Sequence, residues 1–136
     1  MKYNKVKDSG KKRKFNTGAQ RDASISKGRY DLLPCHAIDR LAKHYQNGAQ
    51  RYEDRGWEKG FPLSTFLDSG LRHAFQVLAG KDDEDHASAV VWNFMGFIET
   101  KNRIELGLLP KELDDLPKNQ VLNRQKKEKE ANLWDQ

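Results

Sequence analysis

The sequence predicts an all-α domain, and three observations support this fold class. Apolar residues recur at three- and four-residue steps in two neighbouring segments that together span residues 62–100. A third segment, residues 34–46, repeats this spacing after a proline suited to the first turn of a helix. No strand-like alternation persists for more than a few residues. We therefore expect a small, oligomeric helical bundle built on a helical hairpin (62–100) and one preceding helix (34–46).

Each helix of the expected hairpin has one apolar stripe, and we expect the two stripes to pack against each other. They consist of Leu67, Leu71, Ala74, Phe75 and Leu78 on the first helix and of Ala87, Val90, Val91, Phe94, Met95 and Ile98 on the second. Ser64 is placed to cap the start of the first helix, and Gly80 is placed to end it. Asp82 and Asp83 offer side-chain oxygens to the free N–H groups of the second helix.

Composition and charge limit the size and the partners of this domain. With 136 residues, 36% hydrophobic and 33% charged, the chain has room for one core, and its high charge indicates either disordered segments or oligomerisation. The net charge of +5 is concentrated at the N-terminus, where residues 1–14 hold seven Lys or Arg and one Asp. The rest of the chain is close to neutral, so we expect contact with nucleic acid only through this basic arm.

These features divide the chain into three parts. We expect a disordered basic arm at residues 1–17, the helical domain at 18–117, and a charged tail or frayed helix at 118–136. The single cysteine, Cys35, excludes an internal disulfide and favours a reducing compartment. The sequence contains neither an apolar run long enough for a membrane helix nor a secretory signal, so we expect a cytoplasmic protein.

Two loops before the hairpin carry residues suited to a nucleotide. In the first loop a glycine stands between Lys27 and Arg29, so the backbone and two cations can approach one phosphate; solvated charge is the alternative. In the second loop Tyr52 and Trp57 lie close to Arg55. Aromatic faces beside a guanidinium group suit a flat base with an attached phosphate. The alternative is that these rings are lids over the apolar hairpin.

Polar residues on the hairpin lie outside the apolar stripes. His86 and Asn93 are seven residues apart and share one face of the second helix, and the hairpin turn brings His73 beside them. Asp68 and Arg72 share a flank of the first helix at a spacing of four residues. The two histidines and Asn93 are therefore expected to meet, unless each satisfies a local hydrogen bond at the edge of the core.

Short motifs spread over residues 18–100 resemble one protein family. They are GAQRD (18–22), KGRYDLLP (27–34), NGAxxY (47–52), RGWEKG (55–60), LRH (71–73), GKDxxDH (80–86) and WN (92–93). Of these, KGRYDLLP and RxWEKG are the most specific. The combination resembles the N-terminal domain of phage-encoded dATP/dGTP diphosphohydrolases.

This resemblance implies an all-α domain related to the MazG-like nucleoside triphosphate pyrophosphohydrolases, which oligomerise and cleave between the α- and β-phosphates with a divalent metal. It implies hydrolysis of dATP or dGTP to the monophosphate and pyrophosphate, in the host cytoplasm for a phage protein. MazG-like enzymes hold Mg²⁺ with four carboxylates in ExxE and ExxD motifs, which this chain does not show. Imidazoles in place of carboxylates move the preference toward ions such as Mn²⁺.

Cleavage of a triphosphate needs cations, metal ligands and a positioned water around one cavity. For Mg²⁺ or Mn²⁺ the expected ligands are Asp68, His73, Asp85 and His86, and the expected catalytic residues are His73, Asp85 and Asn93. The expected substrate-binding residues are Lys27, Arg29, Tyr52, Arg55, Trp57 and Arg72. Two alternatives stay open: a protein that sequesters a nucleotide without turnover, and a nucleic-acid-associated accessory protein that uses the basic arm.

Overall fold

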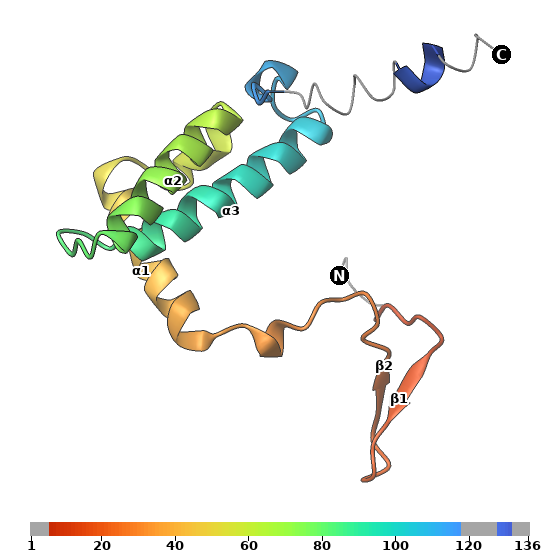
Figure 1. The fold of residues 1–136 in the computed structure, drawn as a ribbon. Helices are drawn as coiled ribbons and strands as arrows, with labels where there is room; N and C mark the ends of the chain where they lie inside the picture. The colour runs from red at the N-terminus through yellow and green to blue at the C-terminus, as the bar shows by residue number, and fades with distance from the viewer. Residues whose placement is uncertain (1–5, 118–127, 132–136) are drawn as a thin grey trace. The chain divides into compact units, whose positions relative to one another are not determined.

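The computed structural model describes residues 6–117 and 128–131, and the chain divides into two compact units, one up to Cys35 and one from His36 onward. The elements of the first unit are strands β1 (Lys12–Lys14) and β2 (Gln20–Asp22) and the 3-10 turn η1 (Tyr30–Leu32). Those of the second are α1 (Cys35–Arg51), η2 (Gly56–Lys59), α2 (Leu63–Leu78), α3 (His86–Glu105) and η3 (Lys111–Leu113) (Figure 1). Helices dominate the described residues, so the predicted all-α class is confirmed. Most of the expected tail at 118–136 lies outside the described residues.

The first unit contains a short antiparallel hairpin. Its register pairs Lys12 with Asp22, Arg13 with Arg21, and Lys14 with Gln20. Residues 12–17, which the sequence places in a disordered arm, therefore form a strand and part of a turn. Strands of three residues are too short for their alternation to be read from the sequence. Residues 1–5 of the expected arm lie outside the described residues, and contact of this segment with nucleic acid stays a prediction.

Helix α1 is longer than its sequence pattern indicates. It continues to Arg51, whereas the sequence pattern predicts an end at residue 46, and it therefore includes Gly48. A glycine that ends a helix adopts a positive φ, and Gly48 is not among the glycines that do so. The chain therefore stays helical through this glycine.

The N-terminus of α2 is capped from a distant part of the chain. Ser64, the expected cap, is the second residue of the helix, and Pro62 occupies the N-cap position without a side-chain hydrogen bond. Instead, the carboxylate of Asp115 accepts hydrogen bonds from the backbone N–H of Ser64, at 2.9 Å, and from its hydroxyl. These bonds with Ser64 lower the pKa of Asp115. The cap therefore ties the segment after η3 to the start of α2.

Replacing Asp115 by alanine is expected to lower the melting temperature at pH 7, because two hydrogen bonds at the helix start are lost. The pKa of Asp115 is lower in the folded state, so its contribution is complete above the ordinary aspartate pKa and is lost as the pH falls through the lowered value. Thermal unfolding of the variant and the native protein should therefore converge in acid. The neighbouring Asp114→Ala variant, which leaves both bonds in place, is the control.

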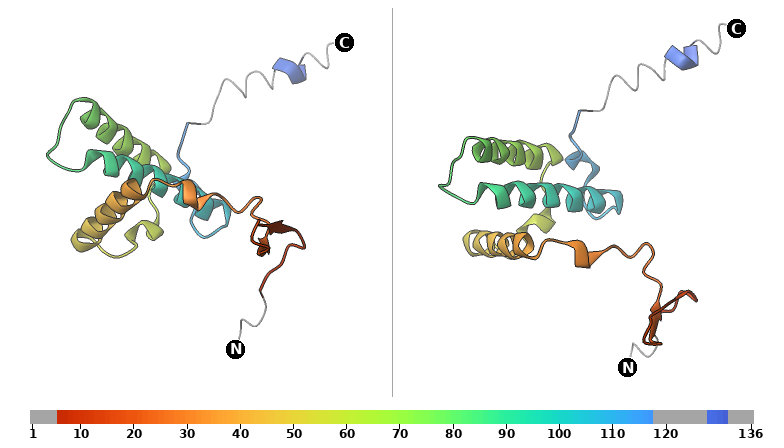
Figure 2. Two further views of the ribbon diagram at one scale, coloured as in Figure 1. Left: turned by 90° about the horizontal axis from the view of Figure 1, so that it is seen from below. Right: turned by 60° about the horizontal axis from the view of Figure 1, so that its bottom comes forward.

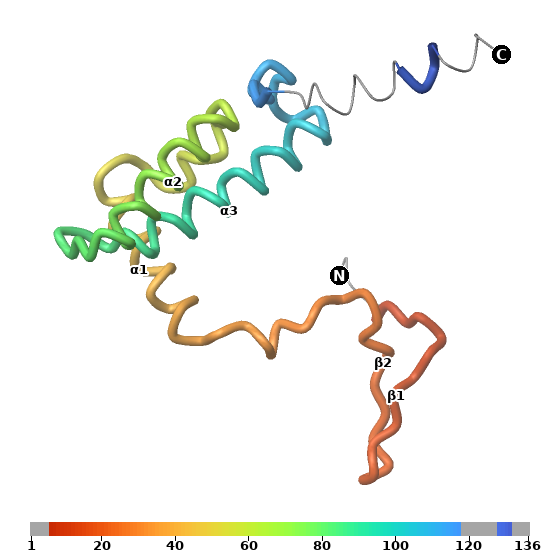
Figure 3. Tube along the Cα trace, in the orientation of Figure 1, coloured from red at the N-terminus to blue at the C-terminus, as the bar shows by residue number. Residues whose placement is uncertain are grey.

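The C-terminal end of α2 confirms the prediction for Gly80. This glycine has a φ of +72°, and its N–H binds the carbonyl of Val77 at 3.0 Å. The next N–H, from Lys81, binds the carbonyl of Gln76 at 3.1 Å. This pair of bonds satisfies the last free carbonyls of the helix. The chain then turns and enters α3, as the trace in Figure 3 shows.

Helices α2 and α3 run antiparallel and side by side (Figure 2). The buried positions between them combine small and large residues: Leu63, Phe66 and Gly70 on α2, and Ala89, Gly96 and Thr100 on α3. A Cβ atom at Gly96 would overlap the ring of Phe66, lying only 3.0 Å from its Cδ1 atom. The two backbones therefore approach closely, with one aromatic ring filling the space above a glycine.

This packing contradicts the expectation that the two apolar stripes face each other. Phe75 and Leu78 of the first stripe, and Phe94 and Ile98 of the second, are exposed. The interface uses the neighbouring faces of both helices because small residues there permit a closer approach. The hairpin was predicted correctly, but the rotation of its helices was wrong.

Helix α1 packs against the N-terminal half of α3. Tyr45 of α1 lies with its ring centroid 6.2 Å from that of Trp92, which in turn lies 6.1 Å from the ring of Phe66. These aromatic contacts join the three helices of the second unit. Among the helices of the described residues, none combines the length and the apolar character needed to cross a bilayer.

Candidate functional site

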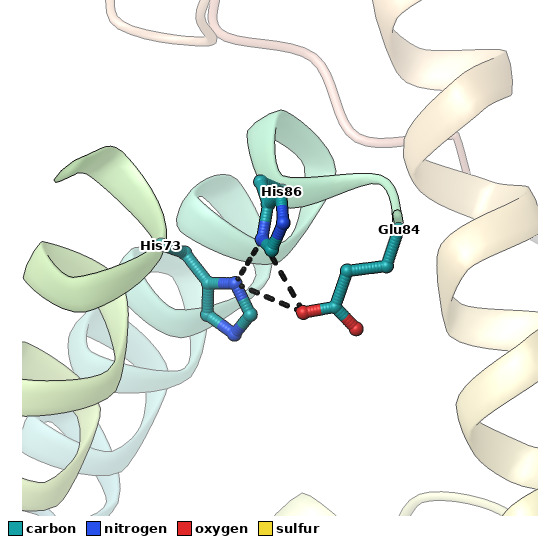
Figure 4. Close-up of side chains that lie close together, drawn as sticks. All are labelled: His73, Glu84 and His86. Atoms are coloured by element: carbon teal, nitrogen blue, oxygen red, sulfur yellow. Dashed lines mark hydrogen bonds and ion pairs between the residues drawn. The ribbon is translucent and has the colours of Figure 1, made fainter. Parts of the chain in front are cut away.

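Three side chains with metal-binding atoms meet at the turn between α2 and α3. His73 comes from α2, His86 is the first residue of α3, and Glu84 lies in the connecting turn (Figure 4). The Nδ1 atoms of the two histidines are 2.9 Å apart. The Oε1 atom of Glu84 lies 3.4 Å from Nδ1 of His73 and 3.3 Å from Nδ1 of His86. We call these three residues the His–Glu–His cluster.

The triangle formed by these atoms has the dimensions of three ligands on one ion. Ligands bound at about 2.0–2.2 Å lie roughly 2.9 Å apart at right angles and roughly 3.4 Å apart at tetrahedral angles. The three separations of 2.9, 3.3 and 3.4 Å fall within this range. Two imidazoles and one carboxylate form a mixed set suited to Mn²⁺ or Zn²⁺ more than to Mg²⁺. The residues of this cluster therefore fit a divalent metal.

A neighbouring carboxylate orients His86. Its Nε2 atom lies 2.8 Å from Oδ1 of Asp83, and its ring is buried. When Nε2 carries the proton and donates it to this carboxylate, the lone pair of Nδ1 points into the cluster. The same hydrogen bond lowers the pKa of Asp83, so its carboxylate stays charged. In many metal sites a histidine ligand donates its other ring N–H to a carboxylate in this way.

The environment of His73 keeps its ring neutral. Burial lowers the pKa of His73 below its ordinary value of 6.5, and the charge of Glu84 opposes this effect only in part. A neutral imidazole has a lone pair to offer to a metal. The ring is thus in the ligating protonation state at pH 7.

Asp85, expected to be a metal ligand and a catalytic residue, is held by other groups. It is the N-cap of α3, where its carboxylate accepts from the backbone N–H of Ser88 at 3.1 Å and from its hydroxyl at 2.7 Å. The guanidinium of Arg40 on α1 donates two further bonds of 2.7 Å, and this partner chiefly holds the pKa of Asp85 well below its usual range. The expectation that Asp82 and Asp83 cap this helix was also wrong.

Next to the cluster lies an open pocket of about 470 Å³. Its walls are Arg40, Val77, Gly80, Lys81, Asp82, Glu84, Asp85, His86 and Ala87. Two cations, Arg40 and Lys81, thus face the same space as two members of the cluster. The sequence reasoning missed Arg40, Lys81 and Glu84. Asp85 accepts a hydrogen bond from the backbone N–H three residues later, as an N-cap residue does, but each of the four consecutive acidic residues 82–85 could do so, and no pattern in the sequence singles out Asp85.

Three expected residues of the hairpin helices do not reach the cluster. Asn93 is buried, and its Nδ2 donates to the carbonyl of Ala89, one turn earlier in α3, at 2.8 Å. Asp68 and Arg72 pair with each other at 3.8 Å on the exposed surface of α2. Of the three residues expected to meet, the structure brings His73 and His86 together.

The expected base-binding residues lie around η2. Trp57 is flanked by two guanidinium groups, those of Arg55 at 5.4 Å and Arg103 at 5.3 Å from its ring centroid. Arg55 also pairs with Glu58, and Tyr52 is exposed. A second pocket, of about 300 Å³, is lined by Trp57 together with Tyr45, Met95, Gly96, Ile98 and Glu99.

The other expected cations, Lys27 and Arg29, belong to the first unit of the chain. Lys27 pairs with Asp22 at 2.7 Å, and Arg29 donates two hydrogen bonds, of 2.8 and 2.7 Å, to the carboxylate of Asp31. Their expected contact with phosphate stays a prediction.

Comparison with known proteins identifies the family. No curated protein and no solved structure matches the chain. The family described as dATP/dGTP diphosphohydrolase, N-terminal, matches residues 17–107, which are well over half of the sequence and include the whole His–Glu–His cluster. The chain therefore belongs to the dATP/dGTP diphosphohydrolase N-terminal domain family.

Proposed function

We propose that this protein is a metal-dependent pyrophosphohydrolase that converts dATP or dGTP to the monophosphate and pyrophosphate. The observation that carries the proposal is the His–Glu–His cluster, whose three ligand atoms lie 2.9 to 3.4 Å apart beside a pocket lined by cations. Membership of the diphosphohydrolase family supports the choice of reaction and of purine deoxynucleotides. The roles of all the residues below are part of this proposal.

The residues around the pocket have two kinds of role, binding phosphate and holding the metal. Arg40 uses two of its five N–H donors on Asp85, which leaves the others for phosphate oxygens, and Lys81 adds a second positive charge. His73, Glu84 and His86 hold the metal, and Asp83 keeps the ring of His86 in position. The bound ion would supply charge neutralisation on the phosphate oxygens and a water of lowered pKa.

Incubating the protein with each of the four dNTPs, in Mn²⁺ or in Mg²⁺, tests the proposal. We expect monophosphate and pyrophosphate from dATP and dGTP, with faster turnover in Mn²⁺ because two of the three ligands are imidazoles. The Glu84→Gln variant should lose this activity while keeping its fold, since the Glu84 side chain is largely exposed and glutamine has nearly the same size. Absence of monophosphate from every nucleotide with either ion would remove the enzyme assignment.

One observation favours a second candidate function, a protein that binds a nucleotide without hydrolysing it. The cluster contains a single carboxylate, whereas the MazG-like enzymes to which the sequence resemblance points use four. Calorimetry of the same mixtures separates the two functions. Stoichiometric binding of a purine dNTP without product formation would assign sequestration.

Lys81→Ala is expected to raise KM for the hydrolysed dNTP by roughly 10-fold with a smaller change in kcat, because one charged hydrogen bond to phosphate is lost. Lys81 lines the pocket and has no ion-pair partner among the described residues. Lys101→Ala removes an equal charge from an exposed position of α3 outside the pocket and serves as the control. Equal KM values for both variants would exclude Lys81 from phosphate binding.

A further inference from the structure

The β1–β2 hairpin has one face that carries positive charge and no carboxylate, and we propose that this face binds single-stranded nucleic acid. The face consists of Lys11, Arg13, Phe15 and Arg21, and we call it the cationic face. Its three cations bind backbone phosphates, and the ring of Phe15 stacks on one unpaired base. Phosphates and bases occur in DNA and RNA alike, so the partner is defined by its single-stranded state and not by its sugar.

The pairing of the two strands places these four side chains together. Successive residues of a strand point to opposite faces, so Lys11, Arg13 and Phe15 share one face. Arg21 is the direct partner of Arg13 on the second strand and therefore lies on the same face. The carbonyl of Lys11 and the N–H of Phe15 also form hydrogen bonds across the hairpin, of 2.8 and 3.0 Å, so the pairing extends to both residues.

The charges on the opposite face of the hairpin are neutralised within the chain. Lys12 pairs with Asp8, and its cross-strand partner Asp22 pairs with Lys27 at 2.7 Å. The third carboxylate of the first unit, that of Asp31, also has a cation at 2.7 Å. All three acidic side chains of this unit are therefore paired with cations outside the cationic face.

Arg13 and Arg21 lie directly opposite each other, and both are exposed. Neither has an ion-pair partner within the part of the chain that the structure describes. Like charges at paired positions of two strands repel each other and destabilise the hairpin. A bound phosphate relieves this repulsion, because the guanidinium groups of both strands can donate hydrogen bonds to its oxygens. The pair that weakens the free hairpin therefore favours an anionic partner.

Phe15 gives the cationic face a surface on which a base can stack. Its side chain is 44% exposed, and the guanidinium of Arg13 lies 5.5 Å from its ring centroid. Proteins that bind single strands combine aromatic rings with cations, since an unpaired base stacks on the ring while its phosphate meets a charge. In a duplex the bases are already stacked on one another. The ring of Phe15 therefore adds to the affinity for a single strand and not for a duplex.

Nucleic-acid binding by the cationic face and hydrolysis of a nucleotide are separate properties of the chain. Three of the four residues precede residues 17–107, which the family model matches, so family membership does not imply this binding. None of the four lines the pocket beside the His–Glu–His cluster. Failure of either activity would leave the other unaffected.

Fluorescence anisotropy of the full chain with labelled 12-mers tests the proposal. Deoxyuridine and uridine 12-mers, which differ only in the 2′-hydroxyl, should bind with affinities within about 3-fold of each other, because the contacts are to phosphates and to one base. Phe15→Leu keeps an apolar side chain but removes the ring. It should weaken binding of both single strands by at least about 5-fold and leave binding of a 12-base-pair duplex unchanged.

Two arginine variants and one matched lysine variant test the face itself. Arg13→Ala and Arg21→Ala should each weaken single-strand binding by roughly 10-fold, because each loses a charged contact with phosphate. Each should also reduce the slope of log K against log salt by about 0.7, the value for one phosphate contact of a single strand. Lys14→Ala removes the same charge from the opposite face of β1 and should change the affinity by no more than about 2-fold.

Several results would overturn the proposal. One is a native chain that does not bind either single strand at about 100 µM protein and 50 mM salt, a concentration at which even non-specific binding is measurable. Others are an equal loss of affinity in Lys14→Ala and Arg13→Ala, or a duplex that binds more tightly than both single strands. If a substitution unfolds the hairpin, NMR of the native chain decides: the deoxyuridine 12-mer must shift the ring signals of Phe15 and the Nε–H signals of Arg13 and Arg21, and unchanged signals contradict the proposal.

Discussion

Replacing His86 by alanine is expected to weaken the binding of Mn²⁺ by at least about 100-fold, because loss of a hydrogen-bonded residue behind a ligand already costs 10- to 100-fold and here the ligand itself is removed. His86 supplies one corner of the triangle, 2.9 Å from His73 and 3.3 Å from Glu84. Without it, two ligands remain on an otherwise solvated ion. Isothermal titration with Mn²⁺ measures the loss of affinity, and an assay of dGTP hydrolysis on the same sample measures the accompanying loss of activity.

Two further variants test whether the lower Mn²⁺ affinity comes from the loss of a metal ligand. Asp83→Asn keeps the ligand but weakens the charged hydrogen bond that orients its ring, so we expect an intermediate loss of roughly 10-fold. His36→Ala removes an exposed histidine that is not part of the cluster and should leave the affinity unchanged. A His86→Ala protein that binds Mn²⁺ as tightly as the native chain would show that the cluster is not the metal site.

Replacing Gly96 by alanine is expected to lower the free energy of unfolding by about 1–3 kcal/mol, the usual cost of adding a methyl group to a filled core. The new Cβ atom would overlap the ring of Phe66. That ring cannot easily move aside, because Phe61 lies edge-on to it at 5.4 Å and Trp92 lies 6.1 Å away. The helices must therefore separate or the aromatic cluster must repack. Chemical denaturation followed by tryptophan fluorescence gives the change in stability.

The matched control is Gly48→Ala. Both glycines lie inside helices, so both substitutions reduce the flexibility of the unfolded chain, but no atom lies within 4 Å of a Cβ atom at Gly48. We expect this variant to gain about 0.5–1 kcal/mol in stability. The difference between the free energies of unfolding of the two variants then gives the free-energy cost of the contact between the new methyl group and Phe66. Equal stabilities would mean that the two helices are not closely packed at Gly96.

The sequence predicted the elements of the fold better than their contacts. Periodicity located the hairpin, and Gly80 ended its first helix as expected. Periodicity could not distinguish a stripe that packs within the chain from one left open on its surface. Gly70 and Gly96 decided the rotation of the helices, because they allow the backbones to approach, and small residues add little to an apolar pattern.

The same limit applied to the site. The spacing of His73 and His86 on a hairpin was sufficient to predict that they meet. It was not sufficient to choose among four consecutive acidic residues, since each carboxylate has a different partner only after the turn has folded. Asp85 binds Ser88 and Arg40, Asp83 binds His86, and Glu84 is left to complete the cluster. Arg40 lies far away in sequence, so no local pattern connects it with this turn.

Glu84 and Asp85 are joined by a single peptide bond, yet they serve different parts of the molecule. One carboxylate faces the two histidines, and the other fastens α1 to the start of α3 through Arg40. A ligand that immobilises the Glu84 carboxylate also restricts the backbone of Asp85. Any coupling between ligand binding at the cluster and the pairing of Arg40 with Asp85 is reciprocal, so each changes the equilibrium constant of the other by the same factor.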